Sequence, residues 1–238
     1  RTMLMCDVVA QAIPVFQKRG TSFLTGDLAS RADKAGVSQG IWGSLMIAGF
    51  VVVLSFPIGI AAGVYLEEYA KPSRLTRFIQ LNIRNLAGVP SVVYGILGLI
   101  VFVQGLDSLT GGRSIIAAGI TLAILVLPII IITTAEAVSA VPSGLREAGF
   151  GVGATRWETT RDHVLPYAAP GILTGTMLAV ARALGEAAPL LLIGAITGRL
   201  ATPHGQSFVQ QLQGKFTAMP IVIYGWANEV NKPGQTTG

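Results

Sequence analysis

The fold is decided by a stretch that reads IIAAGITLAILVLPIIIITTA, Ile115–Ala135. It contains no Asp, Glu, Lys or Arg. About 20 mostly apolar residues in an α-helix cross the hydrocarbon core of a bilayer. A helix on a soluble core carries a polar face instead. The stretch therefore predicts a transmembrane helix.

Three further segments have the same character, and they are Ile41–Leu66, Phe78–Val103 and Ala168–Ile196. Internal prolines are tolerated in such helices when neighbouring groups satisfy the freed carbonyls. Small residues such as Gly59 and Gly63 allow two helices to approach closely. The sequence therefore predicts an all-α fold, a polytopic transmembrane helix bundle with four spans.

Composition supports this class and excludes others. Hydrophobic residues make up 51% of the 238 residues and charged residues only 12%, about half the share of a soluble domain. The net charge of +5 is spread among the connections between apolar runs, so it does not form a nucleic-acid-binding patch. The single cysteine, Cys6, excludes an internal disulfide, and His163 and His204 have no metal-ligand spacing.

Basic residues predict the orientation of the bundle. The connection after the first span carries Lys71, Arg74 and Arg77, and the connection after the third is also rich in arginine. The positive-inside rule places both connections in the cytoplasm. We therefore expect extracytoplasmic segments at 1–40 and 198–238, around a transmembrane domain at 41–197. The chain opens on Arg1 without a signal peptide, and we expect it to begin inside a longer gene product.

The long cytoplasmic connection reads VPSGLREAGFGVGATRWETTRDHVLP, Val141–Pro166. Pro142 suits the first turn of a helix, and Gly151 and Gly153 would end it. Thr155 and Glu158 have the T-x-x-E spacing of a capping box, which starts a second helix. We expect a helix-turn-helix hairpin over 142–166, called the hairpin below.

The hairpin resembles the EAA loop of ABC import permeases. That family's pattern is E-A-A, three residues, G, nine residues, I, one residue, L-P. Here it is matched by Glu147-Ala148-Gly149, then Gly153, then Leu165-Pro166. Gly149 replaces the third alanine and His163 replaces the isoleucine. The resemblance implies that the hairpin inserts into a groove of a separate ATPase subunit, with contacts at Glu147, Ala148, Gly149 and Gly153.

Two further stretches, Leu86–Leu99 and Ala181–Ala195, resemble the phosphate-specific permeases, and Phe216–Val230 resembles their A-type (PstA-type) subunit. The resemblance implies the type I ABC importer permease fold with six spans, two of them beyond Arg1 and Gly238. It also implies a multi-pass protein of the bacterial plasma membrane. The partners implied are a C-type second permease subunit, two copies of an ATPase subunit that holds ATP and Mg, and an extracytoplasmic phosphate-binding protein contacting Asp7–Gln39.

Two opposite charges, Arg182 and Glu186, lie inside the predicted fourth span at i, i+4 spacing. An arginine in a membrane is costly and normally faces a polar path, so we expect this pair to bind the substrate oxyanion. A purely structural ion pair is the alternative. Arg84, Tyr94 and Glu136 are weaker candidates for contact with substrate.

No Ser/His/Asp set, P-loop or H-E-x-x-H motif is present, so we expect a transport subunit without its own ATPase site and without a bound cofactor. A permease for another oxyanion, such as sulfate or molybdate, is one alternative function. An intramembrane protein without a transport role, whose hairpin binds some other cytoplasmic partner, is another.

Overall fold

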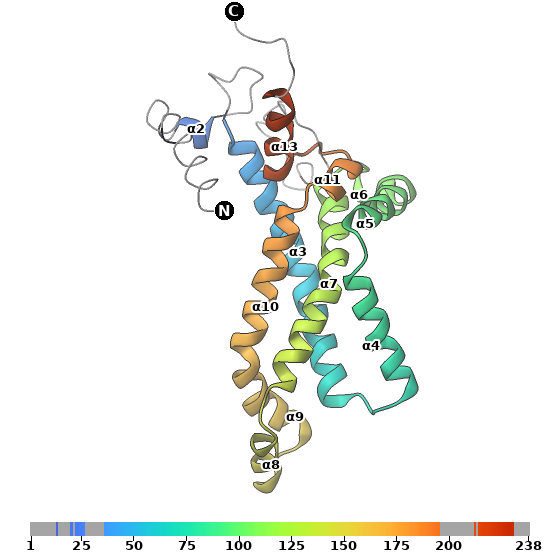
Figure 1. Ribbon diagram of the computed structural model, residues 1–238, viewed down its shortest axis with the longest axis vertical. Helices are drawn as coiled ribbons and strands as arrows, with labels where there is room; N and C mark the ends of the chain where they lie inside the picture. Colours follow the sequence, from blue (N-terminus) through green and yellow to red (C-terminus); the bar gives the residue numbers. More distant parts are fainter. Residues whose placement is uncertain are drawn as a thin grey trace, which may run out of the picture.

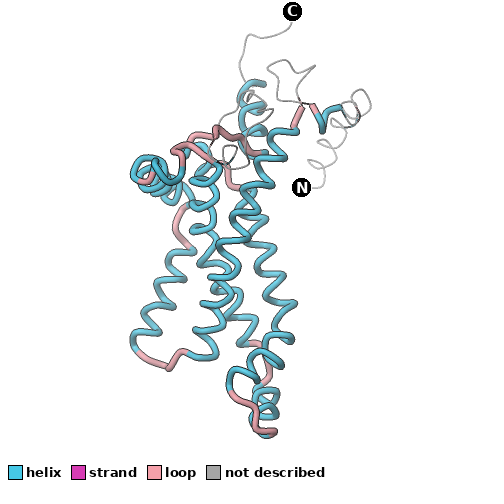
Figure 2. The backbone as a smooth tube through the Cα atoms, turned by 180° about the vertical axis from the view of Figure 1, so that it is seen from behind, coloured by secondary structure: helices cyan, strands magenta, loops and turns pink. Residues whose placement is uncertain are grey.

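The computed structural model describes residues 13, 20, 22–26, 36–195, 212 and 214–230, and every regular element within them is a helix (Figure 2). Three of these helices are long and apolar enough to cross a membrane, and a bent pair of helices adds a fourth candidate span. The prediction of an all-α transmembrane bundle is confirmed. The two predicted extracytoplasmic segments, 1–40 and 198–238, lie largely outside the described residues.

The centre of the bundle is α7 (Ile115–Ser139), which packs along α3 (Ser38–Val64) (Figure 1). Two thirds of the most apolar window of α7 is buried, against 22% for α3. Glycines on α3 make the close approach possible: a Cβ at Gly63 would lie 2.8 Å from the carbonyl oxygen of Ile131 on α7. The expected small-residue contact is thus confirmed at Gly63.

The predicted second span, Phe78–Val103, is not one straight helix. It consists of α4 (Arg74–Ala87) and α5 (Ser91–Gly98), which continues into a π-helical segment, and the two parts meet at 94°. Pro90 disfavours a helical conformation of the residue before it and has no N–H to continue the ladder. The Tyr94 hydroxyl donates a hydrogen bond to the Leu86 carbonyl at 2.9 Å, which ties α5 back to α4 across the bend.

The predicted fourth span, Ala168–Ile196, is also interrupted. The long helix α10 (Leu165–Gly185) ends before Glu186, whose backbone is extended, and α11 (Ala188–Ile193) follows. Pro189 stands in the first turn of α11, where its missing N–H costs nothing. In the sequence, Pro189 has no N–H to donate to the Gly185 carbonyl, which predicts a bend at this point. The structure shows a complete break.

The two ends of the bundle differ in their content (Figure 1). One end holds the turn between α3 and α4 together with the hairpin helices α8 (Ser143–Gly151) and α9 (Arg156–Thr159). The opposite end holds α5 and α11. It also holds α2 (Ser22–Thr25), α6 (Asp107–Thr110) and α13 (Met219–Val230). The two basic connections therefore share one end, as the predicted topology requires.

Two clusters of buried apolar side chains support this arrangement. The larger joins α3, α7, α10 and α11 and includes Ile47, Leu122, Ile130, Ala179 and Leu190. The smaller lies at the hairpin end and is formed by Val64, Val138, Val141, Val164, Ala168 and Ile172. The smaller cluster packs the base of the hairpin against the ends of the spanning helices.

Candidate functional site

The hairpin has the predicted start and turn. Its first helix begins after Pro142 and ends at Gly151. Gly153 has a φ of +83°, in the left-handed region that side chains with a Cβ rarely adopt. A Cβ at this position would meet nothing within 4 Å. The requirement for glycine therefore comes from the backbone conformation of the turn.

The second arm starts with the predicted capping box. The Thr155 hydroxyl accepts a hydrogen bond from the Glu158 N–H at 3.3 Å, and the Glu158 carboxylate accepts one from the Thr155 N–H at 2.7 Å. From α9 the chain continues through a π-helical segment, Thr160–Val164, directly into α10. Pro166 therefore lies inside a continuous helix and does not separate the hairpin from the span.

The tip of the hairpin is exposed and partly apolar. Glu147 and Ala148 are exposed, as expected for residues that contact a partner. Val152 is 82% exposed, and Phe150 and Trp157 are at least half exposed. Sequence reasoning missed these three residues, although apolar side chains beside the turn glycines of a polar loop were a usable signal. Exposed apolar groups at the aqueous end of a membrane protein are typical of a binding surface.

Gly149 has a different position from the other three motif residues. It is buried, and a Cβ there would lie 2.8 Å from the side chain of Thr159 on the second arm. The missing methyl group lets α8 and α9 pack closely. Gly149 therefore sets the shape of the hairpin from inside, while Glu147, Ala148 and Gly153 lie on its surface.

A largely buried ion pair joins the hairpin to the end of α3. Arg146 donates hydrogen bonds through Nε and Nη2 to one carboxylate oxygen of Glu68, at 3.0 and 2.7 Å. It also donates to the carbonyls of Val141 and Val138, at 2.7 and 2.9 Å. Four of the five guanidinium N–H donors are thereby used. The sequence placed Arg146 in the hairpin but did not predict Glu68 as its partner.

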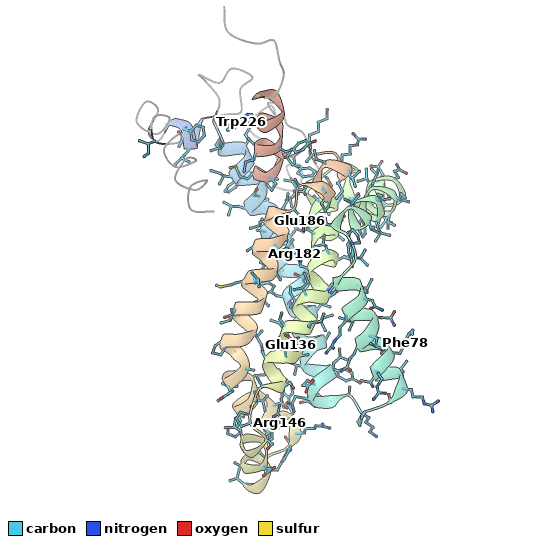
Figure 3. The ribbon with its side chains drawn as sticks, viewed as in Figure 1. Phe78, Glu136, Arg146, Arg182, Glu186 and Trp226 are labelled. Atoms are coloured by element: carbon cyan, nitrogen blue, oxygen red, sulfur yellow. The ribbon has the colours of Figure 1, made fainter. Side chains whose placement is uncertain are left out.

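The predicted substrate pair lies toward the opposite end (Figure 3). Nε of Arg182 is 3.6 Å from Oε1 of Glu186, which is an ion-pair distance and too long for a strong hydrogen bond. The side chain of Arg182 is 55% exposed. The pair was expected well inside a continuous span, but Arg182 occupies the last turn of α10 and Glu186 the break after it. Among the described residues, Arg182 has no other polar partner.

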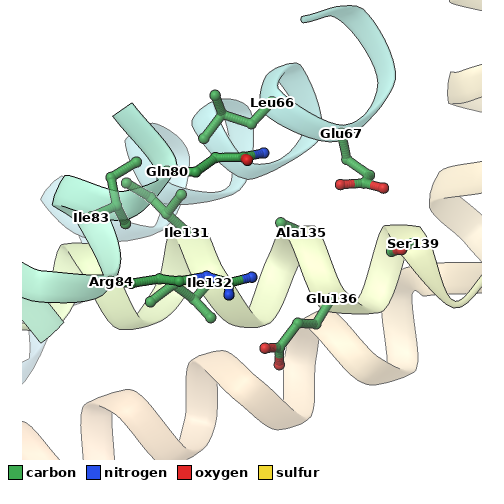
Figure 4. A pocket seen from close by; sticks show the side chains of 10 residues that line it. All are labelled: Leu66, Glu67, Gln80, Ile83, Arg84, Ile131, Ile132, Ala135, Glu136 and Ser139. Atoms are coloured by element: carbon green, nitrogen blue, oxygen red, sulfur yellow. The ribbon is translucent and has the colours of Figure 1, made fainter. Parts of the chain in front are cut away.

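A third group of charges surrounds a pocket of about 130 Å³ between α4, α7 and the end of α3 (Figure 4). Arg84, Glu67 and Glu136 line it, and no ion pair within 4 Å joins the arginine to either carboxylate. Arg84 lies in the last turn of α4, next to the bend. Glu136 directly follows the predicted span Ile115–Ala135, but α7 continues to Ser139.

Residues 55–226 match the family model of the binding-protein-dependent transport system inner membrane component. This match begins inside α3 and covers the later spans, the hairpin and the interrupted helices. The chain belongs to that family. The resemblance first seen in the hairpin is thereby confirmed, and the chain is a multi-pass membrane protein of the ABC permease class.

Named relatives are about one third identical to the chain over the aligned residues. A probable ABC transporter permease, YqgI of Bacillus subtilis, is 36% identical over 76% of the chain and 60% of its own length. The phosphate transport permease PstC of Mesorhizobium japonicum is 34% identical over 81% and 64%. The permease PstA 1 of Mycobacterium tuberculosis is 34% identical over 79% and 59%. The chain spans about three fifths of the length of these relatives.

The fold is also found among solved structures. A chain of the MetNI methionine ABC transporter, in an inward-facing conformation, aligns with a TM-score of 0.56 over 63% of this chain and 70% of its own length. The sequence identity is 23%, so the likeness concerns the fold. It agrees with the predicted arrangement of the type I ABC importer permease.

Proposed function

We propose that this chain is a permease subunit of an ATP-driven importer of inorganic phosphate, in the plasma membrane of a bacterium. The main structural observation in favour of an oxyanion such as phosphate is the Arg182–Glu186 pair. Relatives named as phosphate transport permeases, of both the PstA and the PstC type, match most of the chain. The stretch Phe216–Val230 favours the A-type subunit.

The geometry of the pair suits a partly protonated oxyanion. The printed contact of Arg182 with Glu186 joins Nε to Oε1 at 3.6 Å and is too long for a strong hydrogen bond, so the guanidinium donors are available for phosphate oxygens. Phosphate at neutral pH retains a proton that the Glu186 carboxylate can accept in a hydrogen bond. Sulfate has no such proton and is repelled by the same carboxylate. The pair thus offers binding of phosphate and rejection of sulfate.

The hairpin supplies the contact with an ATPase. Glu147 and Ala148 lie on its surface together with exposed Phe150, Val152 and Trp157. An apolar tip with one carboxylate suits insertion into a groove of another protein. ATP and Mg then bind to that separate subunit, present in two copies, and this chain provides no residues for hydrolysis.

Two further partners complete the proposed importer. A second permease subunit of the C type supplies the other half of the translocation path. An extracytoplasmic phosphate-binding protein contacts Asp7–Gln39, a segment that lies mostly outside the described residues. The family's dependence on binding proteins and the relatives of the two permease types support the presence of both partners.

Transport by the assembled importer tests this proposal. The complex is purified from its own membrane and reconstituted into vesicles, and ATP-dependent uptake of labelled phosphate is measured with a hundredfold excess of sulfate or molybdate as competitor. We expect phosphate uptake that neither competitor reduces. Uptake of sulfate or molybdate in place of phosphate would assign the chain to another oxyanion. Absence of an ATPase from the purified complex would contradict the permease assignment.

A further inference from the structure

The hairpin contacts the end of α3 through both of its arms. Here α3 continues into a π-helical turn, Tyr65–Tyr69, called η1. From the first arm, Arg146 pairs with Glu68 of η1 at 2.7 Å. From the second arm, the guanidinium of Arg156 lies 5.4 Å from the centre of the Tyr69 ring. We call these two contacts together the η1 brace.

The hairpin is not directly connected to α3 along the chain. The hairpin is covalently continuous with α7 on one side and with α10 on the other. Glu68 is 78 residues away from Arg146 in sequence. The η1 brace therefore adds a third attachment point, and it connects the hairpin to the helix that packs most extensively on α7.

The chemistry of the brace suits a role in fixing the position of the hairpin relative to α3 better than a role in raising stability. A buried ion pair usually adds little net stability relative to apolar residues of similar size, because both charges lose their hydration. What it provides is a fixed geometry: Arg146 is held by one carboxylate and two carbonyls at the same time. A π-helical turn widens the helix locally and often marks a functional site.

We propose that the η1 brace makes α3 follow the hairpin, so that a displacement imposed by the ATPase reaches both α3 and α7. Glu68 and Arg146 are positioning residues in this scheme, since neither needs to touch substrate. The inference rests on the proposed function, because it assumes that the hairpin is the point where the ATPase acts. It adds the route by which the movement enters the membrane domain.

The first test measures phosphate transported per ATP hydrolysed in the reconstituted importer. Glu68→Gln keeps the shape of the side chain and removes the ion pair. We expect the ratio to fall about fivefold, at the low end of coupling between distant sites. Asp162→Asn is the matched control, because it breaks the exposed ion pair with Arg161 in the same hairpin, and its ratio should equal that of wild type. An unchanged ratio in Glu68→Gln would overturn the proposal.

A second variant addresses the risk that Glu68→Gln fails to assemble. The double change Glu68→Leu with Arg146→Met fills the site without a buried charge, so folding should be retained. We expect assembled complex in normal amounts with the same fall in the ratio. Wild-type coupling in this variant would contradict the proposal. If the wild-type importer does not transport phosphate, the result would count against the proposed function and not against the brace.

A distance measurement tests the brace without reference to substrate. After Cys6→Ser, spin labels are attached at Lys71→Cys, beside η1, and at Gly151→Cys, where an added side chain meets nothing within 4 Å. In the assembled importer we expect one narrow distance that stays the same with and without a non-hydrolysable ATP analogue. Glu68→Gln should broaden it. A distance that changes with nucleotide in the parent, or is unaffected by Glu68→Gln, would refute the brace.

Discussion

An arginine–glutamate pair lies toward each end of the helix bundle, and the two pairs are built differently. At the hairpin end, Arg146 and Glu68 are 2.7 Å apart, with side chains 23% and 9% exposed. At the opposite end, Arg182 and Glu186 are 3.6 Å apart, with side chains 55% and 23% exposed. The first arginine has four hydrogen bonds, while the second has a single weak ionic contact among the described residues.

This difference separates an arginine used for structure from an arginine available to a ligand. Arg146 has almost no donor left to bind anything else, so its role is to fix the hairpin relative to α3. Arg182 keeps most of its donors and lies at the end of a broken helix. The same two residue types thus support different functions according to how many partners the fold provides.

The largest effect on stability is expected at the hairpin end. Glu68→Ala leaves the partly buried guanidinium of Arg146 without its counter-charge, and we expect a loss of about 3 kcal/mol in the free energy of unfolding. The matched change Glu186→Ala should cost far less, because its partner is exposed. Thermal unfolding of both variants in the same detergent measures the contrast. Equal losses would remove the distinction between the two pairs.

Glu186→Gln tests the selectivity of the other pair. It keeps the shape of the side chain, replaces the charged acceptor of the phosphate proton by a weaker amide oxygen, and removes the repulsion of sulfate. A hydrogen bond to a charged group contributes about 1.5–3 kcal/mol, so discrimination against sulfate should fall about tenfold or more. Counterflow of labelled anions without the binding protein measures it. Unchanged rejection of sulfate would show that Glu186 does not distinguish phosphate from sulfate by the phosphate proton.

A smaller effect is expected at the turn of the hairpin. Gly153→Ala forces a Cβ into the left-handed region, which costs about 1–2 kcal/mol, and should weaken coupling to the ATPase while membrane insertion persists. Gly151→Ala is the control, because that glycine ends α8 without a positive φ and has open space around it. ATPase activity stimulated by the loaded binding protein reports the difference. Equal activity in the two variants would show that the turn geometry is not needed.

The smallest effect is expected from Asp162→Asn. Its ion pair with Arg161 at 2.7 Å joins adjacent residues on the exposed face of the hairpin. Exposed pairs contribute little because water screens them. Unfolding temperature and transport should both stay at wild-type values. A loss comparable to that of Glu68→Ala would mean that exposure is a poor guide to the roles of these pairs.

Local rules predicted much of the hairpin. Proline at its start, glycine at its turn and the Thr155–Glu158 box each act within a few residues, and each is found as expected. Apolar length likewise predicted α3, α7 and α10. These features are visible in sequence because their physical causes lie between near neighbours or between the chain and the bilayer.

Tertiary contacts explain what the sequence did not reveal. Glu68 and Arg146 are separated by two complete spans, and no local pattern pairs them. The sharp bend before α5 was taken as part of a continuous span, and the break after Gly185 was predicted only as a bend, because hydropathy does not indicate the direction of a helix. The substrate role of Arg182 remains a prediction, since it depends on the anion and on a second permease subunit.

Phosphate uptake by Arg182→Leu, measured beside its unfolding temperature in the same reconstituted importer, tests whether Arg182 binds the anion. We expect an unfolding temperature at or above wild type, because a costly charge is removed, and uptake reduced about thirtyfold or more. Arg182→Lys, which keeps the charge without the planar fork, should fall between the two. Normal uptake by Arg182→Leu, or a loss of stability that accounts for the lost uptake, would contradict the claim that this arginine is held available for the anion.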